Sequence, residues 1–312
     1  NGRRILEKPL DAKINNPNES LPFMICWANE NWSRRWDGSE NEILLSQEYS
    51  ILDAENHAKE LLRYITDERY IQHENRPLFA IYKPFLIPNC AEYLSILKQT
   101  IFNLSGINLH ISAFDTGSED LLEIEQLFDS IIEFQPHSPY LKNYISQKIQ
   151  EDKTIKTLKL IQRFSRYKIP VSTLLKKRYL KLEMRIDYSK YVDFIFNNYR
   201  QNLGKIHFPG ITPMWDNTAR RGINSFLFFN NSPEKYAEWL RFILEKNKIN
   251  KKEFLFINAW NEWAEGNHLE PCQKYGLSYL EVTKYELDNL NVEEIASKIC
   301  AHRSQRTTCI SS

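Results

Sequence analysis

The chain has 312 residues, of which 42% are hydrophobic and 26% are charged, and its formal net charge is +1. No apolar run approaches the roughly 18 residues that a membrane-spanning helix needs, so we predict a globular protein without a transmembrane segment. A net charge this close to zero gives no general attraction to nucleic acid or to a membrane, so neither is an expected general partner.

The cysteines are scattered along the chain, without a CxxC pair and without a histidine at zinc-finger spacing. This pattern predicts reduced thiols in a cytoplasmic protein and no structural metal site. Because the first residue is Asn1 rather than methionine, we expect the natural N-terminus to be absent, together with any targeting segment. The five cysteines are Cys26, Cys90, Cys272, Cys300 and Cys309.

Short apolar runs typical of buried strands alternate with longer segments whose apolar residues recur at helical spacing. Such alternation predicts a parallel sheet covered by helices. A polar cap with Pro233 just inside the helix start supports one of the helices. The expected strands cover 22–28, 78–82, 109–114, 130–134, 205–215 and 254–260. The expected helices cover 54–65, 91–102, 232–246 and 275–287.

Polar and aromatic residues follow each expected strand, for example NENW after the first and NEWAEG after the last. In parallel α/β folds the carboxyl ends of the strands form the active face. A doubly wound sheet would usually carry a glycine-rich phosphate turn, and the sequence has no GxGxxG or P-loop motif. We therefore predict an α/β fold of the (β/α)8 TIM-barrel type, with its first two βα units missing from this chain.

We predict one barrel-type catalytic domain over 1–290, followed by a C-terminal helix and polar tail over 291–312. A region near 142–185 is rich in lysine and arginine and shows no clear strand until RIDYS at its end. The simpler interpretation is a solvated helical insertion. The alternative is a basic surface that binds an anionic sugar donor, a polysaccharide or the surface of a bilayer.

The strongest candidate for chemistry is FINAWNEWAEGNHLEP, which places Glu262 and Glu265 three residues apart. On a helical turn, or on a tight loop, two such side chains leave the same face. Carboxyl groups about 5 to 5.5 Å apart are the arrangement of retaining glycoside chemistry. Trp260 and Trp263 flank the pair after an apolar strand, which favours a pocket over an ordinary exposed helix. We predict Glu262 and Glu265 as catalytic residues.

A second cluster is CWANENWSRRWDG, which we expect to form a loop after the first strand. Indole rings stack on sugar faces, and amide and carboxylate groups bind hydroxyls, so this loop is a candidate for substrate binding. The alternative for its arginines and aspartate is a local network of ion pairs. The candidates are Trp27, Asn29, Glu30, Trp32, Arg34, Trp36 and Asp37.

A third cluster is PMWDNTARRG, in which an arginine could hold a carboxylate or phosphate. We set aside a metal at Asn267, His268 and Glu270, because no HExxH or similar spacing supports it. The further predicted substrate-binding residues are Trp215, Asp216, Asn217, Arg220, Trp260, Asn261, Trp263 and Glu270, together with Tyr82, Asp115 and His137 at other strand ends.

These motifs resemble the WbsX-type glycosyltransferases, which are glycoside hydrolase family 99-like proteins of bacterial surface-polysaccharide clusters. The resemblance rests on CWANENWSRRWDGSENEILLSQEYS, TPMWDNTARR and FINAWNEWAEGNHLEP, and it spans nearly the whole chain. It implies a (β/α)8 barrel and a role in making or trimming O-antigen or capsule glycans. It also implies that strands normally precede NGRRILEKPL, the first residues of this chain.

Family 99 enzymes are retaining endo-α-mannosidases with two glutamates at this spacing. By resemblance, Glu262 would be the base that assists attack by the 2-hydroxyl of the sugar, and Glu265 would be the acid and base. This chemistry needs no metal and no cofactor.

Three hypotheses follow from the sequence. The first is a retaining glycosidase-like enzyme, and the second is a glycosyltransferase that uses an activated donor in lipopolysaccharide biosynthesis. The third is a non-catalytic glycan-binding barrel. The expected partners are an oligosaccharide or polysaccharide, with a sugar nucleotide or lipid-linked sugar as the donor in the second case. Peripheral membrane contact through the basic insertion is compatible with any of the three.

Overall fold

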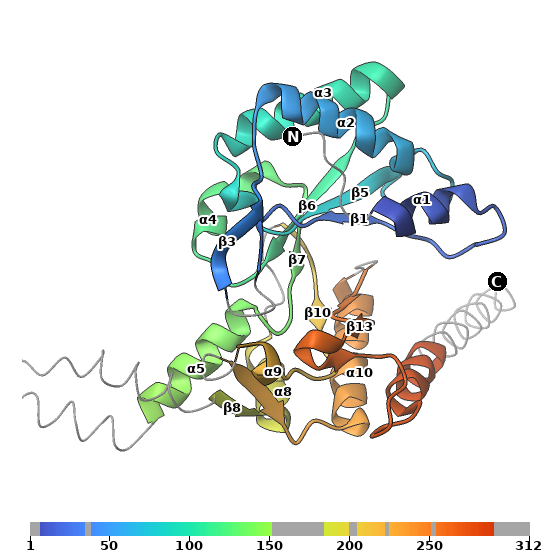
Figure 1. The fold of residues 1–312 in the computed structure, drawn as a ribbon. Helices are drawn as coiled ribbons and strands as arrows, with labels where there is room; N and C mark the ends of the chain where they lie inside the picture. Colours follow the sequence, from blue (N-terminus) through green and yellow to red (C-terminus); the bar gives the residue numbers. More distant parts are fainter. Residues whose placement is uncertain are drawn as a thin grey trace, which may run out of the picture. The chain divides into compact units, whose positions relative to one another are not determined.

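The computed structural model describes residues 7–34, 39–151, 184–199, 205–221, 225–250 and 254–289. The chain divides into two compact units (Figure 1). Unit 1 comprises Asn1–Asn143 and Asn202–Pro209, and unit 2 comprises Tyr144–Gln201 and Gly210–Ser312. No helix in the described ranges is long and apolar enough to cross a membrane. The protein is a mixed α/β structure with a parallel sheet, as the sequence predicts.

Unit 1 contains a sheet whose main path runs in the order of the chain, and every neighbouring pair on that path is parallel. A doubly wound sheet would reverse its order at a switch point, whereas this order advances one strand at a time. A short antiparallel strand, β4 (Gln72–His73), pairs with β5. The path is β1 (Ile25–Trp27), β5 (Arg76–Ile81), β6 (His110–Asp115), β7 (Ser130–Glu133) and β9 (Ile206–Phe208).

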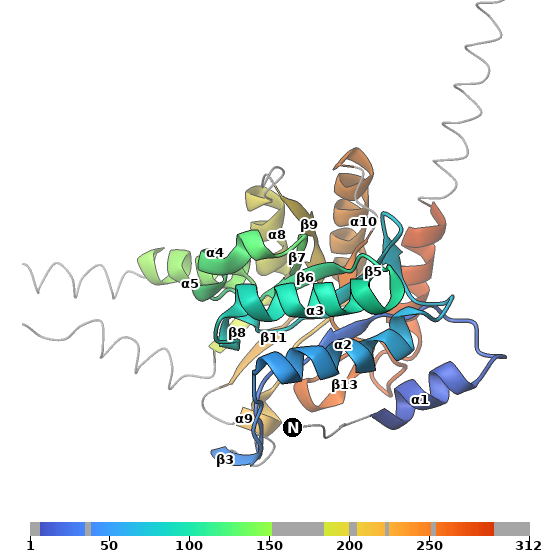
Figure 2. The ribbon, with the colours of Figure 1, turned by 90° about the horizontal axis from the view of Figure 1, so that it is seen from above.

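Two amphipathic helices, α2 (Ile51–Ile65) and α3 (Cys90–Ser105), cover one face of this sheet and lie side by side (Figure 2). The hydroxyl of Ser50 accepts the backbone N–H of Asp53, which caps the start of α2. The smaller helices of unit 1 are α1 (Glu7–Asn15) and α4 (Asp120–Ile124), with 3₁₀ turns η2 (Pro84–Leu86) and η3 (Glu125–Leu127).

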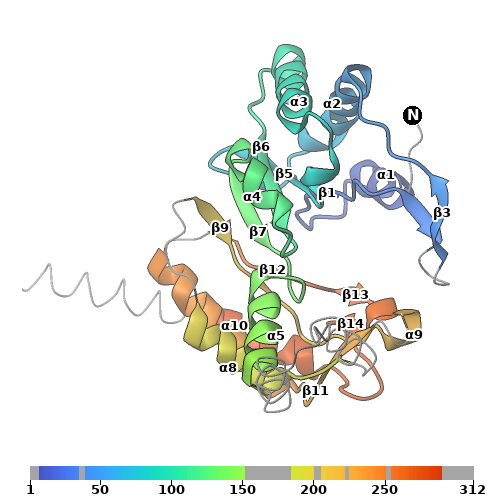
Figure 3. The same cartoon turned by 90° about the vertical axis from the view of Figure 1, so that its left-hand side faces the viewer.

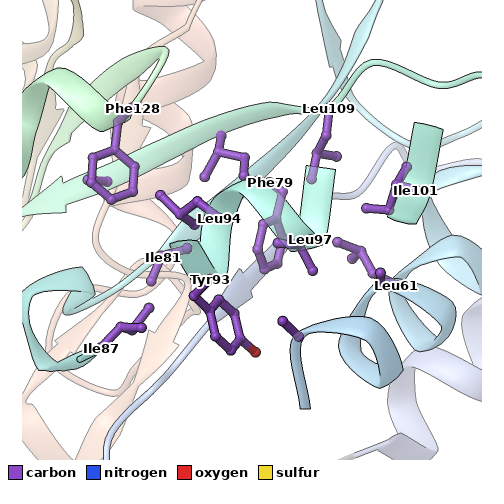
Figure 4. Close-up of a cluster of buried hydrophobic side chains, with 14 of the residues drawn as sticks. Leu61, Phe79, Ile81, Ile87, Tyr93, Leu94, Leu97, Ile101, Leu109 and Phe128 are labelled. Carbon is purple, nitrogen blue, oxygen red and sulfur yellow. The ribbon is translucent and has the colours of Figure 1, made fainter. Parts of the chain in front are cut away.

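The apolar core of unit 1 lies between these helices and the sheet (Figure 4). Leu97 and Ile101 of α3 belong to one cluster with Phe79 and Ile81 of β5, and all four side chains are fully buried. Burying a side chain of this size contributes about 1.5–3 kcal/mol relative to leaving it in water. The burial of one helical stripe and of continuous strand residues agrees with the amphipathic helices and continuous apolar strands that the sequence predicts.

The opposite face of the sheet carries a buried polar cluster at the amino ends of the strands. His110 is fully buried, with Nδ1 2.9 Å from Arg76 Nη2 and Nε2 2.8 Å from Ser130 Oγ. Burial lowers the pKa of His110 to about 4. Asp129 is also partly buried, but the Ile111 N–H, Lys98 and Arg76 more than offset this and lower its pKa to about 2.

We expect His110 to make unit 1 less stable as the pH falls from 7 toward 4. Its pKa is about 4 in the folded protein and 6.5 in an unfolded chain, so between these pH values the unfolded chain binds an additional proton. A shift of this size is worth on the order of 3 kcal/mol in full. His110→Gln should lower the stability at pH 7 but flatten its pH dependence, which urea unfolding at pH 4.5–7.5 would measure. Parallel curves for the two proteins would contradict this origin.

An antiparallel ribbon follows β1, where the sequence analysis expects only a loop. β2 (Trp32–Arg34) pairs with β3 (Ser39–Leu45), with irregular register. The polar character of NENWSRRWDG hides β2, because a strand of three residues without an apolar run shows no period. The expectation of a single loop is therefore wrong for Trp32–Arg34.

In its described residues, unit 2 holds two parallel strand pairs and two helices that pack against each other. β8 (Met184–Asp187) pairs with β11 (Phe226–Phe229), and β10 (Gly210–Ile211) pairs with β12 (Phe256–Ile257). Helices α8 (Tyr188–Asn198) and α10 (Pro233–Asn250) lie side by side (Figure 3), and a further helix covers 278–289. The rings of Tyr188, Tyr191, Phe228 and Trp239 form the aromatic core.

The strand expected at 205–215 is two shorter strands, β9 and β10, because Pro209 lies between them and cannot donate to a sheet ladder. β11 is not among the strands predicted from the sequence. Of the basic region near 142–185, helix α5 (Pro139–Glu151) covers the start and β8 the end, while 152–183 lies outside the described residues. The tail over 291–312 also lies outside them.

Candidate active site

The two predicted catalytic glutamates lie at the two ends of one tight turn in unit 2. Glu262 ends β13 (Asn261–Glu262), and Glu265 ends the 3₁₀ turn η5 (Trp263–Glu265). After the turn, β14 (Asn267–His268) returns antiparallel to β13. A 3₁₀ turn has three residues per turn, so this geometry suits two side chains that leave the same side. Both glutamates are partly buried.

The side chain of Arg220 forms an ion pair with the carboxylate of Glu265. Its Nη1 donates to Glu265 Oε1 at 3.0 Å, and the two side chains are 27% and 20% exposed. The short helix α9 (Thr218–Arg221) carries Arg220 and packs against η5. The backbone N–H of Asp216 donates to the carbonyl of Glu265 at 2.8 Å, which ties the same two segments together. Arg220, predicted as a ligand for substrate, therefore holds the carboxylate of a predicted catalytic residue.

Gly266 allows the close approach of these two segments. Its φ of +53° is in the left-handed region, and a Cβ built there would lie 2.9 Å from the carbonyl oxygen of Asp216. The three nearest atoms are the carbonyl oxygen, the Cβ and the backbone nitrogen of Asp216, so no flexible side-chain end could move aside. The glycine thus meets two requirements, one of conformation and one of space.

We expect Gly266→Ala to lower the free energy of unfolding by about 2–3 kcal/mol, as a strained backbone and a steric clash are combined. Gly276→Ala is the matched control, because Gly276 has a similar φ of +55° but open space around its Cβ position. We expect about 1 kcal/mol for this control. Urea unfolding of both variants gives the comparison, and equal losses would show that contact with Asp216 contributes nothing.

Trp263 is an exposed indole with a fixed orientation. Its ring is 49% exposed, its Nε1–H donates to Glu270 Oε2 at 2.7 Å, and it stacks on His268 with ring centroids 3.7 Å apart. His268 Nδ1 lies 3.0 Å from the backbone carbonyl of Glu270. A carbonyl oxygen only accepts, so Nδ1 carries a proton. Glu270, predicted to bind substrate, therefore holds a tryptophan that is predicted to do the same.

The structure buries several other predicted contacts of unit 2. Trp215 is 1% exposed and stacks on Phe226, and Asn217 is 3% exposed. Asp216 is exposed, but its Oδ1 accepts from the N–H and the hydroxyl of Thr218 at the start of α9. Trp215 and Asp216 thus make contacts within the protein, and the side chain of Asn217 is buried. Trp260, at 53% exposed, and Asn261 remain open to solvent.

In unit 1, the carboxyl ends of β1 and β5 are joined by polar contacts. The side-chain amide of Asn29 is fully buried and exchanges two hydrogen bonds with the backbone of Lys83, at 2.7 and 2.8 Å. Lys83 Nζ then donates to Glu30 Oε1 at 2.7 Å. Trp27 packs against His57 and Tyr93 rather than standing free. Asn29 and Trp27 thus support the strand ends, and Glu30 is half-buried above them.

The remaining candidates of unit 1 lie at the ends of the next strands. Tyr82 packs its ring against Phe134, which stacks on His137 at a centroid distance of 6.3 Å. The Oδ1 of Asp115 accepts the backbone N–H of Gly117 at 2.9 Å. Trp32 is 44% exposed on β2, with Arg34 at the end of that strand. Trp36 and Asp37 lie outside the described residues.

Two side chains near these sites were not among the predicted site residues. Lys83, which follows Tyr82, pairs with Glu30, and His268 supports the ring of Trp263. The signal for Lys83 is its place directly after a strand. For His268 the signal is weaker, because alternation in a two-residue strand carries little information.

The model of the family described as "Glycosyltransferase WbsX" matches residues 1–283. The chain belongs to the WbsX glycosyltransferase family.

Two curated relatives share 27% identity with this WbsX-family chain over 304 residues, which is 96% of the chain. Both carry the name "Uncharacterized protein WxcX" and come from Xanthomonas campestris pv. campestris, strains B100 and ATCC 33913. The match covers 39% of their length, so the chain spans about two fifths of these relatives.

Two solved structures are also similar to the chain. One is described as a "Glycoside hydrolase-like protein", with 12% identity, a TM-score of 0.42, and coverage of 76% of this chain and 60% of the other. The second is the GH99 endo-alpha-mannosidase from Bacteroides thetaiotaomicron, with 14% identity, a TM-score of 0.41, and coverage of 76% and 62%.

The turn of this WbsX-family chain brings together groups that suit acid–base chemistry. One carboxylate is held by a guanidinium, a second is three residues away, and an indole is fixed between them in sequence. Such carboxyl groups can donate or accept a proton at a sugar oxygen. In the described ranges, no group of three or more His, Cys, Asp or Glu side chains is placed to hold a metal ion.

Proposed function

We propose that the chain contains the catalytic domain of a carbohydrate-active enzyme that acts at a glycosidic bond of a bacterial surface polysaccharide, either O-antigen or capsule. The observation that carries the proposal is the turn from Glu262 to Glu265, whose second carboxylate is oriented by Arg220, in a chain of the WbsX family. The substrate is an oligosaccharide or polysaccharide, and no cofactor takes part.

The proposed chemistry retains the anomeric configuration. Glu262 takes the proton of the sugar 2-hydroxyl while the 2-oxygen of the sugar attacks the anomeric carbon. In the same step, Glu265 protonates the oxygen of the leaving sugar. An incoming hydroxyl then gives its proton to Glu265 and opens the resulting epoxide, and the 2-oxygen recovers its proton from Glu262. If the hydroxyl belongs to water the reaction is hydrolysis, and if it belongs to a sugar it is transfer.

A glycosyltransferase with an activated sugar donor is the second candidate, and the description of the family favours it. In that reaction the leaving group is a phosphate or a lipid-linked phosphate, which departs without a strong acid. One glutamate is then needed only as the base that accepts the proton of the acceptor hydroxyl. A sugar nucleotide or a lipid-linked sugar becomes a partner in this case.

We also propose that the chain forms one domain of the (β/α)8 type over 1–290. The sequential order of the parallel strands in unit 1 supports this architecture, and so does the βα alternation that precedes β12. A cytoplasmic location is part of the same proposal, and the scattered cysteines without a CxxC pair support it.

The test offers the protein a panel of oligosaccharides and nucleotide sugars. Mass spectrometry then separates the outcomes. Shorter oligosaccharides indicate hydrolysis, longer ones indicate transfer, and consumption of a nucleotide sugar identifies an activated donor. Binding of a glycan without any change in mass would contradict an enzymatic role and favour a non-catalytic binding barrel.

A further inference from the structure

Unit 2 contains a cavity of about 660 Å³ beside the glutamate turn. Trp263 and Gly266 line it on the side of the turn, and the segment 271–275 lines it opposite. Its volume falls within the range of about 300–1,000 Å³ that is typical of small-molecule sites. Glu262 and Glu265 are not among its lining residues. The cavity is therefore a neighbour of the proposed reaction site and not the same site.

The wall formed by Trp263 is rigid. The indole N–H is held by Glu270 at 2.7 Å, and the ring stacks on His268 with an angle of 16° between the planes. About half of the indole remains exposed to solvent, so a ligand can reach it. A ring fixed in this way loses little conformational freedom when a ligand packs on it.

The other lining residues include apolar side chains such as Phe228 and polar side chains whose charges balance. Asp216 and Lys274 carry opposite charges, and Gln273 adds an amide that is exposed on the same segment. The Lys274 ammonium lies 4.6 Å from the ring centroid of Tyr275, which holds its charge near the cavity. Such a lining offers hydrogen-bond donors and acceptors without selecting a strongly charged ligand.

A pyranose ring matches this combination of surfaces. Its C–H face is apolar and packs on an aromatic ring, while its hydroxyl edge needs donors and acceptors. We propose that the Trp263 cavity is a binding subsite for an uncharged hexopyranose unit of the glycan, with Trp263 as its platform. His268 and Glu270 are positioning residues that hold this platform. The inference rests on the proposed function only in taking the ligand to be a glycan.

Binding is tested by saturation-transfer NMR with the methyl glycosides of glucose, galactose and mannose, in the Glu265→Gln background so that turnover plays no part. Trp263→Ala should lower the affinity for the methyl glycoside at least about tenfold, as is usual for a tryptophan at the centre of a binding site. Tyr285→Ala is the matched control, because Tyr285 is an exposed ring of the same unit at 61% exposure. An equal loss of affinity in Trp263→Ala and Tyr285→Ala would overturn the subsite. So would the absence of binding to the Glu265→Gln protein itself.

Two variants test the positioning role of Glu270 separately. Glu270→Ala removes the acceptor of the indole N–H and should weaken binding about threefold to tenfold. Glu270→Gln retains an acceptor oxygen and should restore most of the affinity. If the alanine and glutamine variants weaken binding equally, the hydrogen bond from Trp263 does not hold the platform.

A measurement on the unaltered cavity guards against misfolded variants. Cys272 lines the cavity and is a free, partly exposed thiol. A bound glycoside should slow its alkylation by iodoacetamide severalfold, as peptide mapping by mass spectrometry would show. Unchanged alkylation at a saturating glycoside concentration would overturn the proposal. An inactive enzyme that still binds at Trp263 would contradict the proposed function alone.

Discussion

Glu265→Gln is expected to lower turnover by about 10²–10⁴-fold while oligosaccharide binding stays near that of the unaltered protein. A general acid or base acts mainly in the transition state, so its loss reduces kcat more than it changes ground-state affinity. The amide keeps the shape of the side chain and can still accept the hydrogen bond from Arg220. Steady-state kinetics on a substrate identified by mass spectrometry measures kcat and KM separately.

Glu262→Gln should give a loss of similar size, since each glutamate has its own proton to move. Glu281→Gln is the control, because Glu281 is an exposed glutamate of the same unit on the helix over 278–289. Full activity in Glu265→Gln would remove Glu265 from the mechanism. A large loss in Glu265→Gln with none in Glu262→Gln would favour a single base and an activated donor.

Arg220→Gln is expected to lower kcat on the order of 10²-fold, because Glu265 loses the group that orients it. The pH dependence carries more information than the size of the loss. A guanidinium favours the ionised form of a neighbouring carboxylate, so its removal makes Glu265 keep its proton to higher pH. In the bell-shaped profile, the basic limb should move to higher pH if Glu265 acts as an acid.

If Glu265 acts only as a base, the acidic limb should move to higher pH instead. Arg220→Gln thus distinguishes hydrolysis with an acid from transfer with an activated donor. Arg63→Gln serves as the control, since Arg63 pairs with Glu60 on the exposed surface of unit 1. A profile in which neither limb moves would show that the ion pair has no part in catalysis.

The sequence predicts most of the parallel strands from their continuous apolar runs. It predicts four helices from apolar residues that recur at helical spacing. Leu78–Ile81 and His110–Ala113 are buried on both faces, so their runs are continuous. β2 and β13 are not predicted because they lack such a run. β2 has three residues and β13 has two, which are too few to show a period.

The candidate site is predictable in its residue types but not in its pairings. The spacing of Glu262 and Glu265 is local, so a turn between them can be expected. The contact between Arg220 and Glu265 spans 45 residues, and it depends on a glycine that lets two backbones meet. Likewise, Trp215 and Trp263 are equally aromatic in the sequence, yet one is 1% and the other 49% exposed. Only tertiary packing separates a core ring from a ring that can meet a ligand.

Asp129 has a consequence for how unit 1 unfolds. Its carboxylate is shared by Lys98 of α3, Arg76 of β5 and the backbone of β6, and Arg76 is 53 residues away in the chain. Detaching any one of these three elements leaves a partly buried charge short of partners, which is costly. Partial unfolding of unit 1 therefore costs free energy whichever of the three elements detaches. We expect hydrogen exchange of β5, β6 and α3 to report one shared opening event, so that these elements behave as a single cooperative block.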